Sequence, residues 1–67
     1  MIEYAKHNMV TLIKLITTAC DSKNKLALPA LIQSAIACDK ELRAGGGVNT
    51  AELVKAINRG NATLRQA

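Results

Sequence analysis

Residues 43–52 read RAGGGVNTAE and separate two stretches with helical patterning. Glycine is the usual residue just after the last turn of a helix, so Gly45 is expected to end the helix that precedes it. Asn49 and Glu52 have the spacing of a capping box, in which the first side chain accepts an N–H of the new helix and the glutamate reaches back. Residues 45–48 are therefore expected to form a flexible connector, after which a further helix folds back beside the earlier ones.

Two helices are expected before the glycines. Over residues 2–20, apolar side chains recur at alternating spacings of three and four, which predicts an amphipathic helix of about five turns. Residues 21–25 form a polar break. Pro29 belongs in a first turn, because proline has no N–H and clashes with the carbonyl four residues earlier, so the second helix is expected over residues 27–44. Asp39 falls within its apolar arc, and we expect it to pair with Arg43, four residues later.

A third, shorter helix is expected over residues 50–65. Leu53, Ile57 and Leu64 share one face of it with Gly60. Glycine inside a helix costs about 1 kcal/mol relative to alanine, so two interpretations stay open: the helix frays or turns at Gly60, or the missing side chain lets a neighbouring helix approach closely. The predicted fold is all-α, a helical hairpin plus a third helix in one domain over residues 1–67.

The size and composition of the chain favour self-association. It has 67 residues, no Phe or Trp and one Tyr, and a chain of this size that folds alone buries only about 60% of its unfolded surface. Several disulfides or a structural metal would compensate, but neither is indicated. We expect a homo-oligomer that forms through the face of the third helix and a mixed edge of the first, where Tyr4 and Leu15 are separated by Asn8 and Thr11.

The sequence does not predict a membrane span. The most hydrophobic stretch, Met9–Ile16, already contains Thr11 and Lys14, whereas a span needs roughly 18 or more consecutive apolar residues. The amino terminus does not resemble a secretory signal, because charged residues at positions 3 and 6 precede a short apolar run without a small-residue cleavage pattern. A cytoplasmic location without a membrane partner is expected.

The two cysteines, Cys20 and Cys38, are expected to remain free. In an antiparallel hairpin that turns near residues 22–26, their axial offset is about 15 Å at 1.5 Å per residue. A disulfide allows roughly 7 Å between Cα atoms. Both thiols are therefore expected to act as small hydrophobic side chains.

Catalysis and metal binding are not expected. His7 is the one histidine, and it falls on the polar side of the first helix. Neither it nor the cysteines show the paired spacing of metal ligands, and three helices of this size are not expected to enclose the few hundred cubic ångströms that a substrate usually occupies. No cofactor is predicted, since the three glycines lack the lysine, further glycines or preceding strand of a phosphate-binding loop.

The charges become informative once the third helix folds back. The net charge of the chain is +4, from nine Lys and Arg and five Asp and Glu. The end near residues 21–25 then holds four cations and one carboxylate, for a net charge of +3, whereas the opposite end holds three cations and four carboxylates. The residues of the positive end are Asp21, Lys23, Lys25, Arg59 and Arg65.

These charges predict a non-catalytic protein that sequesters or recognises an anionic ligand, of nucleotide type or a short nucleic-acid backbone, at a basic site between subunits. The predicted ligand-binding residues are Lys23, Lys25, Arg59 and Arg65, assisted by Lys55 and Asn58, with Tyr4 as the only ring available for stacking. Three alternatives remain. The charges can simply complement helix dipoles, or the amphipathic helices can dock on a partner as an antagonist or adaptor. The third is a small DNA-binding regulator, although five residues between the last two helices fit a helix-turn-helix poorly.

Overall fold

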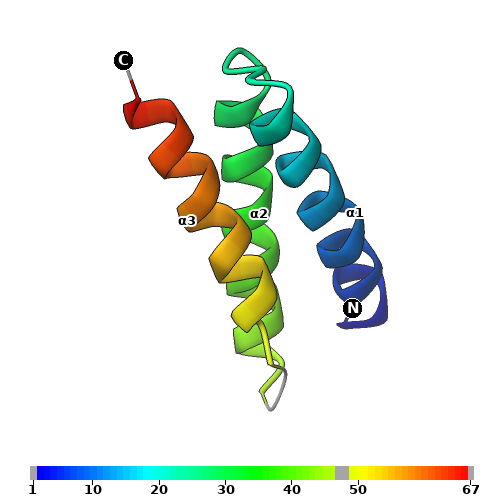
Figure 1. The fold of residues 1–67 in the computed structure, drawn as a ribbon. Coiled ribbons are helices and arrows are strands. Elements are labelled where there is room, and N and C mark those ends of the chain that lie inside the picture. Colours follow the sequence, from blue (N-terminus) through cyan, green and yellow to red (C-terminus); the bar gives the residue numbers. More distant parts are fainter. Residues whose placement is uncertain (1, 47–48, 67) are drawn as a thin grey trace.

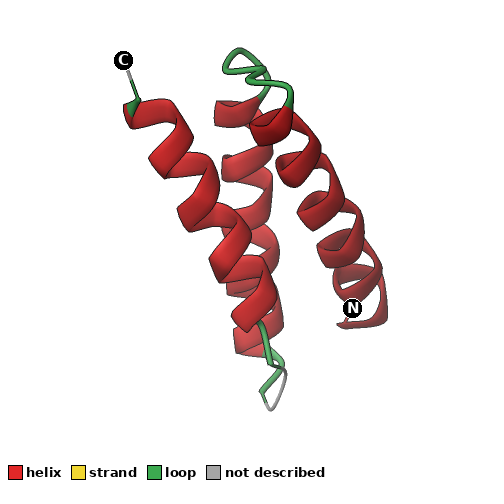
Figure 2. Cartoon of the chain, viewed as in Figure 1, coloured by secondary structure: helices red, strands yellow, loops and turns green. Residues whose placement is uncertain are grey.

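The structure, a computed structural model, describes residues 2–46 and 49–66. It consists of three α-helices, α1 (Ile2–Asp21), α2 (Leu28–Ala44) and α3 (Ala51–Arg65), each packed against the other two (Figure 1). Successive helices run in opposite directions, and the described residues contain no strand (Figure 2). The predicted all-α fold, a hairpin with a third helix folded back on it, is confirmed. The bundle is elongated, with extents of 37 × 16 × 15 Å.

The core lies between the three helices and is built from aliphatic and other small side chains. Ile16, Leu28, Leu42 and Leu53 are the largest side chains that are completely buried. Smaller buried residues fill the space around them, namely Ala5, Ala19, Cys20, Ile32, Ala35, Cys38, Ala56 and Ile57. Both cysteines are free, as predicted. Because alanine and cysteine are small, the helices can pack closely without aromatic side chains.

Gly60 is buried where α3 packs against the other helices. A Cβ atom at this position would lie 3.0 Å from Cδ1 of Ile32 and 3.4 Å from Cγ2 of Ile16. The helix continues through Gly60 to Arg65. Of the two interpretations of this glycine, close approach is therefore correct, and fraying is wrong.

The glycine connector begins as expected. Gly45 caps α2 and donates its N–H to the carbonyl of Glu41, at 3.2 Å, and Gly46 takes a left-handed backbone conformation with φ of 72°. Residues 47 and 48 of the predicted connector lie outside the described residues. Pro29 occupies the first turn of α2, and Nε of Arg43 lies 3.0 Å from a carboxylate oxygen of Asp39. The prediction of that ion pair is confirmed.

The start of α3 differs from the predicted capping box. Asn49 accepts a hydrogen bond from the N–H of Ala51, at 3.0 Å, but the N-cap residue is Thr50. Glu52 is consequently the second helical residue rather than the third, one position too early to reach back to the cap. Its carboxylate instead lies 3.7 Å from Nζ of Lys55.

No helix within the described ranges is long and apolar enough to cross a lipid bilayer.

Candidate functional site

The antiparallel course of the helices brings four cations to one end of the molecule. α1 and α3 both finish at this end, and the turn of residues 22–27 connects α1 to α2 there (Figure 1). We call the group formed by Lys23, Lys25, Arg59, Arg65 and Asp21 the basic end. Its formal net charge is +3.

Two contacts between distant segments join the parts of the basic end. A guanidinium nitrogen of Arg59 forms an ion pair with Asp21, which lies at the end of α1. Nζ of Lys25 donates a hydrogen bond to the backbone carbonyl of Gln66, just beyond α3. Because Gly60 allows α3 to pack closely, its neighbour Arg59 lies within reach of α1. The turn, the end of α1 and the end of α3 therefore meet at one end of the bundle.

The cations of the basic end are accessible to solvent. The side chains of Arg59 and Asp21 are 50% and 62% exposed, so water screens their ion pair. Lys23 and Arg65 are also exposed, and neither has an ion-pair partner among the residues that the structure describes. An anion approaching this end meets positive charge that the fold has only partly neutralised.

Helix dipoles explain only part of this charge distribution. Arg65 lies in the last turn of α3, where a cation complements the carbonyl end of a helix. The last turn of α1 contains no basic residue, and Lys23 and Lys25 lie beyond it in the turn. The dipole effect falls off within the last turn. Dipole compensation therefore accounts for Arg65 better than for the two lysines.

The two arginines of the basic end leave α3 on different sides of the helix. Arg59 and Arg65 are six residues apart on α3, so their side chains leave the helix about 120° apart. Asn58, seven residues before Arg65, shares its flank of the helix about two turns below it. A ligand that contacts both arginines must therefore reach across one end of α3.

Two predicted site residues are not brought to the basic end. Tyr4 lies 17 residues before Asp21 on α1, which places it about 25 Å along the helix axis. It is 65% exposed at the opposite end of the bundle. Lys55 lies near the start of α3, where its ammonium group faces Glu52. The structure therefore separates the aromatic ring and this lysine from the group of four cations.

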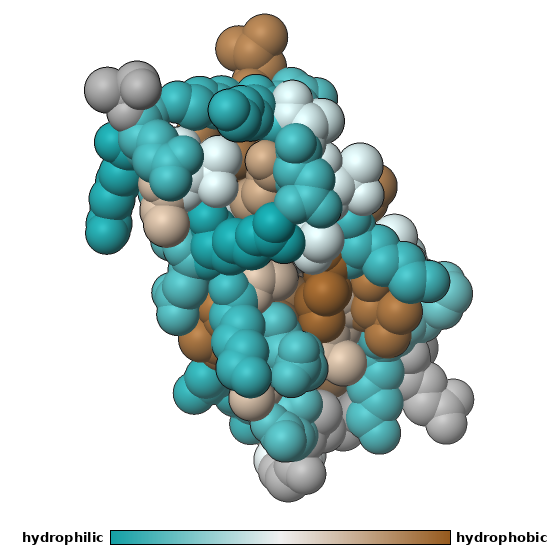
Figure 3. Space-filling model, viewed as in Figure 1, coloured by the Kyte–Doolittle hydropathy of each residue, from teal (hydrophilic) through white to brown (hydrophobic). Residues whose placement is uncertain are grey.

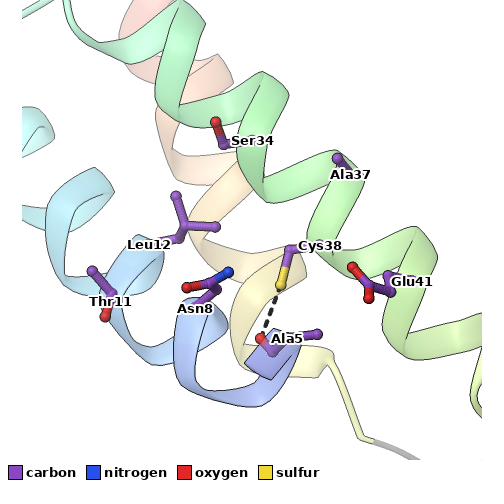
Figure 4. A pocket seen from close by; sticks show the side chains of 8 residues that line it. All are labelled: Ala5, Asn8, Thr11, Leu12, Ser34, Ala37, Cys38 and Glu41. Carbon is purple, nitrogen blue, oxygen red and sulfur yellow. Dashed lines mark hydrogen bonds between the residues drawn. The ribbon is translucent and has the colours of Figure 1, made fainter. Parts of the chain in front are cut away.

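A surface groove between α1 and α2 was not anticipated from the sequence. It has a volume of about 370 Å³, and its lining side chains lie between the two helices (Figure 4). The lining residues are Ala5, Asn8, Thr11, Leu12, Ser34, Ala37, Cys38 and Glu41. The groove is open at the surface, so it does not contradict the expectation that three short helices enclose no space of this size. The short side chains of Ser34 and Ala37 leave the gap between the helices unfilled.

The thiol of Cys38 at this groove is held in its neutral form. Its Sγ donates to the carbonyl of Ala5 at 3.1 Å (Figure 4). Burial raises the pKa of Cys38, and the carboxylates of Glu41 and Asp39 raise it further. A thiol with a raised pKa is a poor nucleophile near neutral pH, because the thiolate is the reactive form.

Two further features bear on the site. Leu26, in the α1–α2 turn, is 96% exposed, and Figure 3 shows hydrophobic atoms protruding at this end of the molecule. The described residues contain no group of three or more His, Cys, Asp or Glu side chains that could hold a metal ion.

Comparison of the chain with protein-family models, with curated proteins and with solved structures finds no match.

Proposed function

We propose that this protein is a non-catalytic, homo-oligomeric binding protein that recognises or sequesters an anionic ligand of nucleotide type. The observation that carries the proposal is the assembly of Lys23, Lys25, Arg59 and Arg65 at one exposed end. Ammonium and guanidinium groups are the usual donors to phosphate oxygens, and guanidinium pairs with them in a bidentate manner.

The ligand is held between subunits. A single basic end offers cations around its rim, so one copy contacts a small anion with only some of them. When two such ends meet they repel, since each carries a net charge of +3. A bound polyanion removes this repulsion and is contacted by cations from both copies. Ligand binding and association of the basic ends are thus linked.

Exposed apolar side chains on α1 support the oligomer. Tyr4 and Leu15 are 65% and 47% exposed, on the flank of α1 that borders the groove. Burying them against another copy adds the apolar contact that a small core lacks. We place this activity in the cytoplasm, because free buried thiols are typical of a reducing compartment.

Paired charge substitutions test the site. The double variant Lys25→Ala and Arg59→Ala removes two cations from the basic end, and Lys6→Ala with Lys40→Ala removes two exposed cations from the opposite end. Both variants have the same net charge. Titration with ATP should show binding lost in the first and retained in the second, and the oligomer mass measured without ATP should be unchanged in both. Equal affinity in the wild type and the first variant would remove the proposal.

Salt dependence separates the kinds of anion. A long phosphate backbone releases counterions on binding, so its affinity falls steeply with salt. A nucleotide at one inter-subunit site should show a shallower dependence. Native mass spectrometry of protein purified from cells reports the subunit number and any retained small molecule together. A steep slope with a DNA duplex and no retained nucleotide would favour the DNA-binding regulator instead.

The groove between α1 and α2 favours a second candidate function, that of an antagonist or adaptor of another protein. Its volume of about 370 Å³ and the exposed Tyr4 and Leu15 fit an amphipathic helix of a partner. Such apolar binding should respond little to salt, and it should survive the Lys25→Ala and Arg59→Ala double substitution.

A further inference from the structure

We infer that the ligand of the basic end carries an apolar face beside its phosphates, as a nucleoside phosphate does, and that Leu26 contacts this face. The inference rests on the proposed function and names the class of anion that the site prefers. It is carried by a separate observation, the exposure of one leucine among the cations.

Leu26 is exposed to an unusual degree. It is 96% exposed, whereas the other large hydrophobic side chains on the described surface, Tyr4, Val10, Leu15 and Ile36, are 47% to 65% exposed. It directly follows Lys25 in the α1–α2 turn. An apolar surface in water gains free energy when another apolar surface covers it.

The turn that presents Leu26 is held by hydrogen bonds on both sides. The N–H of Asn24 donates to Ala19 at 2.8 Å, and the N–H of Ala27 donates to Asn24 at 3.3 Å. Lys25 is tied to the carbonyl of Gln66. A ligand therefore meets an apolar side chain on a backbone that is already ordered, so little backbone entropy is lost on contact.

Leu26, rather than Tyr4 as the sequence pattern predicts, contacts the apolar part of the ligand. The ring of Tyr4 is about 25 Å from the end of α1 along the helix axis, too far for a nucleotide whose phosphates lie at the basic end. Leu26 is at the same end as the cations. Inorganic polyphosphate can use the cations alone, whereas a nucleoside phosphate uses the cations and Leu26 together. An aliphatic side chain contacts the face of any base, so this contact does not select one base.

Two probes and two matched variants test the inference on the full chain. The probes are ATP and inorganic triphosphate, titrated calorimetrically at one salt concentration. Leu26→Ala should weaken ATP binding by about fivefold, the effect of uncovering part of one leucine side chain, and should leave triphosphate affinity unchanged. Ile36→Ala is the control, because it truncates an exposed aliphatic side chain in the middle of α2. It should change neither affinity.

The outcomes separate this inference from the proposed function. If Leu26→Ala binds ATP as tightly as the wild type, or weakens both probes equally, the contact with the nucleoside is overturned while the phosphate site stands. If the wild type binds neither probe, the proposed function fails with it. Truncating a side chain that is 96% exposed leaves the core untouched. The wild type and Leu26→Ala should therefore have the same thermal unfolding midpoint, so a change in ATP affinity cannot be attributed to a loss of folding.

Discussion

Arg59 on α3 forms an ion pair with Asp21 at the end of α1, although 38 residues separate them in the chain. The contact joins the surfaces of α3 and α1 at the basic end, and it also occupies one of the four cations there. An anionic ligand therefore competes with Asp21 for this guanidinium.

Asp21→Asn should raise the affinity for ATP by about threefold to fivefold, because a carboxylate near the ligand phosphates disappears and Arg59 becomes available. Both partners are half or more exposed, so loss of the ion pair should cost less than about 1 kcal/mol of stability. Calorimetric titration and urea unfolding check the two expectations. Asp39→Asn is the control, since it breaks the other ion pair with an arginine, at the opposite end of the bundle. An equal gain in both variants would mean that net charge alone is responsible.

Gly60→Ala tests the packing of α3 against α2. Alanine gains about 1 kcal/mol in helix propensity, but its Cβ would lie 3.0 Å from Cδ1 of Ile32. Overpacking of a core costs roughly 1–3 kcal/mol, so a net loss of about 1 kcal/mol is expected. Ile32→Val removes the crowded Cδ1 atom. In a double-mutant cycle measured by urea unfolding, the two substitutions together should cost less than the sum of the single ones. Strict additivity would show that the contact is not tight.

Much of this fold is predictable because the residues that start and end its helices act locally. Gly45 and Pro29 act on the backbone within their own turn, and apolar spacing reports the buried face of each helix without knowledge of the others. The Asp39–Arg43 ion pair is local in the same sense, since it joins successive turns of one helix. The capping box failed for a local reason too, because a shift of one residue in the helix start changes which side chain can reach the cap.

The candidate site is less predictable, because it depends on relations between helices. Sequence patterning identified the cations of the basic end, but it also included Tyr4, which the length of α1 places at the other end. The groove depends on how small side chains on α2 face α1, which no single helix reveals. Asn8 and Thr11, which line the groove, share one edge of α1 at helical spacing. That pattern alone predicts a subunit contact and does not distinguish it from a groove. The exposure of Leu26 likewise depends on the tertiary structure, because the sequence shows only an apolar residue next to the start of α2.

The thiol of Cys38 should make stability depend on pH in the alkaline range. Burial and two carboxylates raise its pKa in the folded protein, so the neutral thiol favours folding below the pKa of an exposed thiol. That contribution is lost as the pH rises above about 9, where the unfolded chain releases the proton more readily. The free energy of unfolding should therefore fall more between pH 7 and pH 10 in the wild type than in Cys38→Ala. Cys20→Ala keeps the Cys38 thiol and should retain the wild-type dependence; the same slope in all three proteins would contradict the assignment.

Leu15 and Val10 offer a matched test of the oligomer, because both are 47% exposed on α1. Five residues separate them, so they lie about 140° apart around the helix. Leu15 follows Asn8 and Thr11 of the groove lining at helical spacing, whereas Val10 faces away from that flank. Leu15→Glu should therefore place a charge in the subunit contact and shift the sedimentation mass at micromolar concentration toward the monomer. Val10→Glu introduces the same charge and should leave the mass unchanged. A wild-type monomer, or equal masses for both variants, would exclude this flank of α1 as the contact, and the basic ends would then have to associate by other means.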